Sequence, residues 1–151
     1  MGISKLLNAL LLTPFLLFSC KNVELLPEEK ELTVQEQAAL DFHNKVRSDV
    51  SNPPLEWDYD LAKYAQNWAD SLAATNGENI VHRETAGKNY KNTGENIFWG
   101  TGKEYTYLDA SEAWYSENEI YTYEEINEQN YYATGHYTQM IWKDSKKMGM
   151  G

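Results

Sequence analysis

The chain has 151 residues, of which 42% are hydrophobic, and it carries 13 Lys and Arg against 23 Asp and Glu, a formal net charge of −10. This length and apolar content suit one folded domain, and the acidity argues against a nucleic-acid partner, because phosphate contacts need a basic face. A single Cys excludes an intramolecular disulfide and any zinc site built on two or four Cys, so a histidine-based site must draw on His43, His82 and His136.

The first 19 residues have the pattern of a signal peptide. An apolar run over residues 6–18 is too short to cross a bilayer of about 30 Å, and it ends at Cys20 in the sequence LFSC, which resembles a bacterial lipobox. We therefore expect an exported lipoprotein of the cell envelope or surface, with a lipid on Cys20 as its only membrane contact. The alternative is an ordinary signal peptide with an incidental Cys, which predicts a secreted, extracellular protein.

Residues 21–32 are charged and have no sustained period, so with Cys20 they predict a tether ahead of a domain over residues 33–151. Thr33 and Glu36 have the spacing of a capping box, which predicts a helix to about Val50. Its buried stripe is expected to be Ala39, Phe42, Val46 and Val50. A second helix is expected over residues 59–74, with an inner face made by Leu61, Tyr64, Ala65, Trp68 and Leu72.

Residues 78–103 contain several Gly and predict loop and strand, with residues 96–99 as the strand. A third helix is predicted over residues 109–121, with Asp109 at its N-cap and Glu119 facing solvent. One apolar face of this helix carries Ala113, Trp114, Glu117, Ile120 and Tyr121. A carboxylate on an apolar face is costly unless it is paired or bound, so Glu117 is a candidate site residue.

Four short motifs follow one another along the chain. Residues 43–47 (HNKVR) fit HNxxR, residues 94–97 are GENI, residues 114–121 fit WxxE…Y, and residues 135–142 (GHYTQMIW) fit GHYTQxxW. The first two are weak alone, whereas the octapeptide is specific. Together they resemble the CAP superfamily, which includes cysteine-rich secretory proteins, antigen 5 proteins and pathogenesis-related 1 proteins, and the likeness covers residues 33–151.

The resemblance implies an α/β fold, in which an antiparallel sheet lies between helical layers as an α–β–α sandwich. It also implies a cleft that holds His82, Glu95, Glu117 and His136. Two imidazoles and two carboxylates make a nitrogen and oxygen site for a divalent cation such as Zn²⁺. In the family the domain continues into further strands after the GHYTQ helix, so we expect it to be C-terminally incomplete at Gly151.

A structural role for the same residues stays open. His82 and His136 would then only hydrogen-bond to Glu95 and Glu117, without a metal. The other motif positions, which are expected to support the fold, are His43, Asn44, Arg47, Asn96 and Gln139. We expect His43 to link helix and loop, and Arg47 to bond backbone carbonyls.

Three functions are compatible with these residues. The first is a non-enzymatic binding module with a metal cleft and a nearby hydrophobic ligand site, because an aromatic segment after the third helix is similar to one associated with sterol binding in fungal relatives. The second is a metal-dependent hydrolase with Glu95 or Glu117 as general base, which is disfavoured because no GxSxG or HExxH motif is present. The third is a surface domain whose acidic, tyrosine-rich face meets a partner protein.

Overall fold

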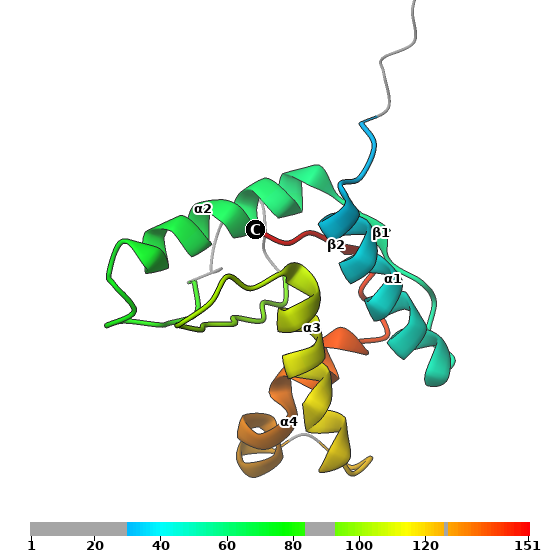
Figure 1. Ribbon diagram of the computed structural model, residues 1–151. Helices are drawn as coiled ribbons and strands as arrows, with labels where there is room; N and C mark the ends of the chain where they lie inside the picture. The colour runs from blue at the N-terminus through cyan, green and yellow to red at the C-terminus, as the bar shows by residue number, and fades with distance from the viewer. Residues whose placement is uncertain (1–29, 84–92, 126) are drawn as a thin grey trace, which may run out of the picture. The chain divides into compact units, whose positions relative to one another are not determined.

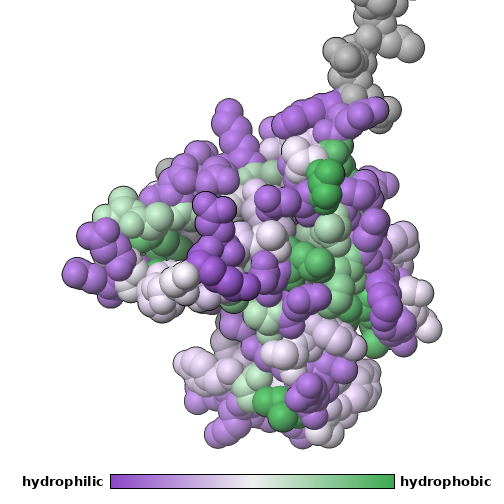
Figure 2. Space-filling model, in the orientation of Figure 1, coloured by the Kyte–Doolittle hydropathy of each residue, from purple (hydrophilic) through white to green (hydrophobic). Residues whose placement is uncertain are grey.

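The computed structural model describes residues 30–83, 93–125 and 127–151, and its contacts group Glu31–Gly151 as one compact unit (Figure 1). The predicted signal peptide, Cys20 and most of the tether lie outside these residues. Within the described part, no helix combines the length and the apolar character that crossing a bilayer requires. Hydrophilic residues cover much of the face seen in Figure 2.

Helix α1 spans Val34–Asp49 and begins at the predicted capping box. The Thr33 hydroxyl accepts a hydrogen bond from the Glu36 N–H at 3.3 Å, and the Glu36 carboxylate accepts one from the Thr33 N–H at 2.7 Å. These two bonds satisfy backbone donors that the first turn of a helix leaves without partners. Ala39 and Val46 are buried as expected, whereas Val50 is the C-cap and is exposed, because the chain leaves the helix there.

Helix α2 spans Tyr59–Ala73, close to its predicted bounds, and the Asp58 side chain accepts from two N–H groups of its first turn. Leu72 is the one buried residue of this helix. The other members of the predicted inner face are half-buried, because much of that face borders a pocket.

The third helix begins and ends earlier than predicted. Helix α3 spans Tyr107–Tyr115 and is followed by a 3-10 turn, η1, over Ser116–Glu119. Thr106 is the N-cap, and Asp109 is the third helical residue that completes the capping box. Asp is common at both positions, so the sequence alone did not separate them. Because the chain changes direction at η1, Ile120 is exposed. Its predicted place on the inner face of the helix is therefore wrong.

Helices α1, α3 and α4 pack around one core. Helix α4 spans Glu128–Met140 and contains the GHYTQ motif. The buried cluster takes one residue from α1, two from α3 and two from α4, namely Val46, Ala110, Trp114, Tyr137 and Met140. Aromatic rings extend this cluster in edge-to-face contacts, such as Tyr121 on Tyr137 at 5.0 Å between centroids.

Arg47 ties this core to the chain that follows α4. Its side chain is fully buried, and its guanidinium donates four hydrogen bonds of 2.8–3.1 Å to backbone carbonyls, namely those of Pro53, Met140, Trp142 and Ser145. This is the carbonyl-binding role expected from the sequence. The planar fork of donors on Arg lets one side chain satisfy carbonyls from two distant segments.

The described strands form one short parallel pair. Strand β1 (Glu56–Trp57) pairs with β2 (Lys147–Met148), with Glu56 opposite Lys147. The resemblance implied an antiparallel sheet, but these strands lie some ninety residues apart in the sequence and the helices between them return the chain in the same direction. Residues 96–99 form no strand, which corrects the prediction. The Ile97 carbonyl accepts instead from the Trp114 indole N–H, and the Asn96 side-chain amide donates to the His136 carbonyl.

The elements form three layers, which confirms the α/β sandwich. Helix α2 makes one layer, and α1, α3 and α4 make the other (Figure 1). The extended chain after β2 runs between them: the backbone at Gly149 lies against Asp58 and Ala62 of the α2 start, while Met150 packs on the core cluster. A side chain at position 149 would collide with α2 backbone, so glycine permits this close approach.

Candidate functional site

His136 and Glu117 form the better-supported of two His–Glu pairs. His136 Nδ1 lies 2.6 Å from Glu117 Oε1, and Glu117 Oε2 accepts a hydrogen bond from the Tyr137 N–H at 2.9 Å. The His136 side chain is 39% exposed and that of Glu117 18%. Both carboxylate oxygens of Glu117 therefore have hydrogen-bond partners. A carboxylate on an apolar helix face needs such partners, because burying an unpaired charge costs free energy.

A kink in α4 makes the Tyr137 N–H available. Thr134 has non-helical dihedrals (φ −138°, ψ 19°), so a second helical segment begins just after it. The first N–H groups of a helix have no partner within the helix, and they favour a negative charge. Glu117 supplies that charge from η1, so it caps the segment that carries His136.

Trp114 fixes the orientation of the His136 ring. The two rings are stacked, with centroids 6.4 Å apart and 21° between their planes, and Trp114 itself is buried. The His136 carbonyl accepts from the Asn96 amide at 3.0 Å. Helical periodicity places Trp114 in the core, where it lies, but does not reveal its contact with His136. The position of Trp114 one helical turn before Glu117 is the signal that points to this second role.

His82 and Glu95 form the second pair, on segments without regular secondary structure. His82 Nδ1 lies 2.8 Å from Glu95 Oε1, which also accepts from the Arg83 N–H at 3.0 Å. The His82 side chain is 54% exposed. The segment is held on α2 by the Trp68 indole, which donates to the Val81 carbonyl, and by the Arg83 guanidinium, 3.8 Å above the Tyr64 ring.

The remaining motif residues position these segments. Asn44 exchanges two hydrogen bonds with the backbone of Leu55, which fixes the chain before β1. Gly94 packs against the Gln139 side chain, and a Cβ at position 94 would require the Gln139 amide to move. His43 is buried and donates from Nδ1 to the Ala39 carbonyl of its own helix, so the predicted link from helix to loop is wrong for this nitrogen.

The four predicted metal ligands meet as two pairs. Among the residues that the structure describes, no group of three or more His, Cys, Asp or Glu side chains is placed to hold a metal ion. In each pair a carboxylate oxygen accepts from Nδ1, which leaves Nε2 of the imidazole with the lone pair. A carboxylate that orients an imidazole in this way is a common partner of a metal-bound histidine. Each pair therefore presents an imidazole Nε2 whose ring is oriented by a glutamate, Glu95 for His82 and Glu117 for His136.

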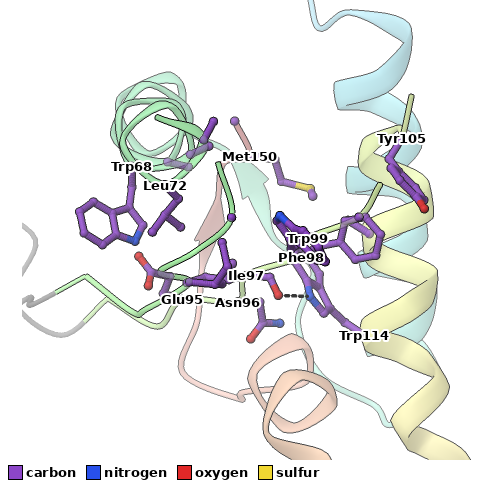
Figure 3. Close-up of a pocket in the computed structure, with 18 of the residues that line it drawn as sticks. Trp68, Leu72, Glu95, Asn96, Ile97, Phe98, Trp99, Tyr105, Trp114 and Met150 are labelled. Carbon is purple, nitrogen blue, oxygen red and sulfur yellow. Dashed lines mark hydrogen bonds between the residues drawn. The ribbon is translucent and has the colours of Figure 1, made fainter. Parts of the chain in front are cut away.

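A pocket of about 530 Å³ borders Glu95. Figure 3 shows Trp68 and Leu72 of α2 on one side and Phe98, Trp99 and Trp114 on the other. Indole, phenyl and aliphatic groups dominate this lining, and Glu95 supplies a charged group. The volume lies in the range of sites for small molecules, and such sites are mostly apolar with a few polar groups.

Comparison with known proteins identifies the family to which this fold and its paired His–Glu geometry belong. Residues 40–151 match the cysteine-rich secretory protein (CAP) family. The chain is 39% identical to pathogenesis-related protein 1C of Nicotiana tabacum over 76% of its own length. It is 33% identical to pathogenesis-related leaf protein 4 of Solanum lycopersicum over 90% of its length and 79% of that protein. It is also 33% identical to human Golgi-associated plant pathogenesis-related protein 1, over 74% and 68% of the two lengths.

The chain belongs to the CAP family. As a member of a secretory family it is an exported type of domain. It spans 63% of the length of the tobacco relative. Lipid attachment at Cys20 and the identity of any ligand stay predictions.

Proposed function

We propose that this chain is a non-enzymatic binding module that holds a divalent cation, with Zn²⁺ as the best match, at its two His–Glu pairs. The observation that supports this is the hydrogen bond from Nδ1 of both His82 and His136 to a glutamate. It selects the tautomer that a metal requires at Nε2. When bound, the cation would supply an electrophilic centre for a ligand, while the protein holds and orients the imidazoles.

Calorimetric titration with zinc tests this proposal. We expect saturable binding to the wild type and a loss of binding in His82→Ala and in His136→Ala. Glu117→Gln should weaken binding by roughly ten- to a hundredfold, the usual cost of losing an orienting partner. His43→Gln is the matched control, because His43 is buried and spends Nδ1 on the Ala39 carbonyl. Absence of zinc binding in the folded wild type contradicts the proposal.

We further propose that the apolar pocket beside Glu95 takes a small hydrophobic ligand. Its aromatic and aliphatic lining supports this, with a volume near 530 Å³. Titration with a fluorescent sterol and a fluorescent fatty acid measures it. Ala69→Phe fills the pocket and should abolish binding, while Ala74→Phe, one residue beyond α2 and outside the lining, should leave it unchanged. Equal affinity in both variants would overturn this assignment.

A further inference from the structure

The end of η1 and the start of α4 expose large side chains on one surface. This tyrosine surface consists of Ile120 (67% exposed), Tyr123 (93%), Tyr131 (53%) and Tyr132 (83%). Figure 2 shows green, hydrophobic residues beside purple, hydrophilic ones at the lower end of the view, where Figure 1 places α4 and the turn before it. None of these side chains belongs to the core cluster or lines the pocket described above.

Hydrogen bonds hold this surface in place. The Asn130 amide donates to the Glu124 carboxylate at 3.1 Å and to the Glu125 carbonyl at 2.9 Å, which ties the turn to the start of α4. The Tyr131 and Tyr132 rings contact each other edge to face, with centroids 5.8 Å apart. A surface that is already ordered loses little conformational entropy when a partner binds.

The segment that carries these rings has charged side chains of one sign. Glu119, Glu124, Glu125 and Glu128 are exposed beside them. Residues 104–142 contain eight acidic residues and no Lys or Arg. The ion pairs found among the described residues involve none of these four glutamates. Such a surface repels acidic molecules and attracts basic ones over about a Debye length.

We propose that the tyrosine surface binds a Lys- or Arg-rich segment of another protein, at a site separate from the His–Glu pairs. Cationic side chains would lie on the Tyr rings, and the glutamates would accept their hydrogen bonds. The chain already uses this chemistry internally, with the Arg83 guanidinium 3.8 Å from the Tyr64 ring centroid and the Lys103 ammonium 4.7 Å from that of Tyr105. Exposed aromatic groups beside carboxylates suit a basic polypeptide, because rings add contact area to charge attraction.

Binding of a labelled peptide that alternates Arg with Leu tests the proposal by fluorescence anisotropy and by amide chemical shifts. We expect saturable binding that weakens with salt, with shifts confined to residues 119–132. Tyr123→Ser combined with Tyr132→Ser should weaken binding at least about tenfold, the scale of an interface hot spot. Tyr→Phe at the same two positions should retain most of the affinity, because the ring is kept.

Charge is tested separately with Glu124→Gln combined with Glu125→Gln, which keeps oxygen acceptors but removes two charges. This pair should lower the affinity and flatten its salt dependence, while Glu56→Gln with Glu78→Gln, two exposed glutamates elsewhere, should not. The proposal is overturned if the matching Glu–Leu peptide binds equally well, if shifts map to another surface, or if sedimentation shows that a second copy of the chain covers the tyrosine surface and excludes the peptide.

Discussion

The pair His136–Glu117 lies between packed helical elements, whereas His82–Glu95 joins two segments without regular secondary structure. Glu117 is held by a helix N-terminus and His136 by a stacked, buried indole. The second pair relies on one indole hydrogen bond, a cation–π contact and the Arg83 N–H. One His–Glu pair is therefore supported by packed helices and the other by surface contacts. We expect the loss of the first pair to lower the free energy of unfolding more than the loss of the second.

Removing Arg47 should lower the stability most, because Arg47 anchors the end of α4, the helix that carries His136. In Arg47→Met the carbonyls of Pro53, Met140, Trp142 and Ser145 lose a buried donor. We expect the free energy of unfolding to fall by about 3–5 kcal/mol, as when one partner of a buried charged network is removed. Urea denaturation of the two proteins measures this, and a loss below about 1 kcal/mol contradicts the role given to Arg47.

Truncating the two glutamates compares the pairs directly. Glu117→Ala leaves the His136 Nδ1 and the Tyr137 N–H without a partner in a partly buried place, so we expect a loss of about 2 kcal/mol. Glu95→Ala should cost less than about 1 kcal/mol, because His82 is more than half exposed and water replaces the carboxylate. Equal losses, measured by the same denaturation, would show that the two pairs have equivalent support.

Replacing Arg83 tests the support of the exposed pair. Arg83→Gln removes the cation over Tyr64 and Trp68 but keeps the backbone N–H that bonds Glu95. The expected loss is about 0.5–1 kcal/mol. Amide hydrogen exchange should quicken around residues 81–83 and 95 while α4 stays protected. A global increase in exchange would instead place Arg83 among the residues that hold the whole domain together.

Replacing His43 should have the smallest effect of this series on stability at neutral pH. Burial lowers its pKa below the ordinary 6.5, with Arg47 adding to the decrease and the bond to Ala39 opposing it. The unfolded chain then binds a proton at about pH 6.5 that the folded chain resists, so stability is complete above that pH and falls as the pH drops below it. Denaturation at a series of pH values should show a smaller acid decrease in His43→Gln than in the wild type.

Local patterns in the sequence identified α1, α2 and the buried Arg47, and they singled out Glu117. Those features depend on neighbours three or four residues away, on caps, and on the rule that a buried charge needs partners. The predicted start of α3 is a few residues too late, because both Thr106 and Asp109 are residue types that commonly occupy an N-cap. The strand predicted at residues 96–99 is not formed. The Ile97 carbonyl accepts from Trp114 of α3, and the Asn96 side chain donates to α4, and no local pattern reports these two contacts.

The sequence by itself determined the helices, the motif order and the family, since periodicity, capping and a specific octapeptide are local properties of the chain. Only the tertiary structure decided that His82, Glu95, Glu117 and His136 meet as two pairs, and that Trp114 stacks on one of them. Those contacts join residues 13 to 22 positions apart, so they depend on how α3, α4 and the extended segment pack. The kink at Thr134 also depends on tertiary structure. It frees the Tyr137 N–H, whose hydrogen-bond partner, Glu117, comes from a separate element.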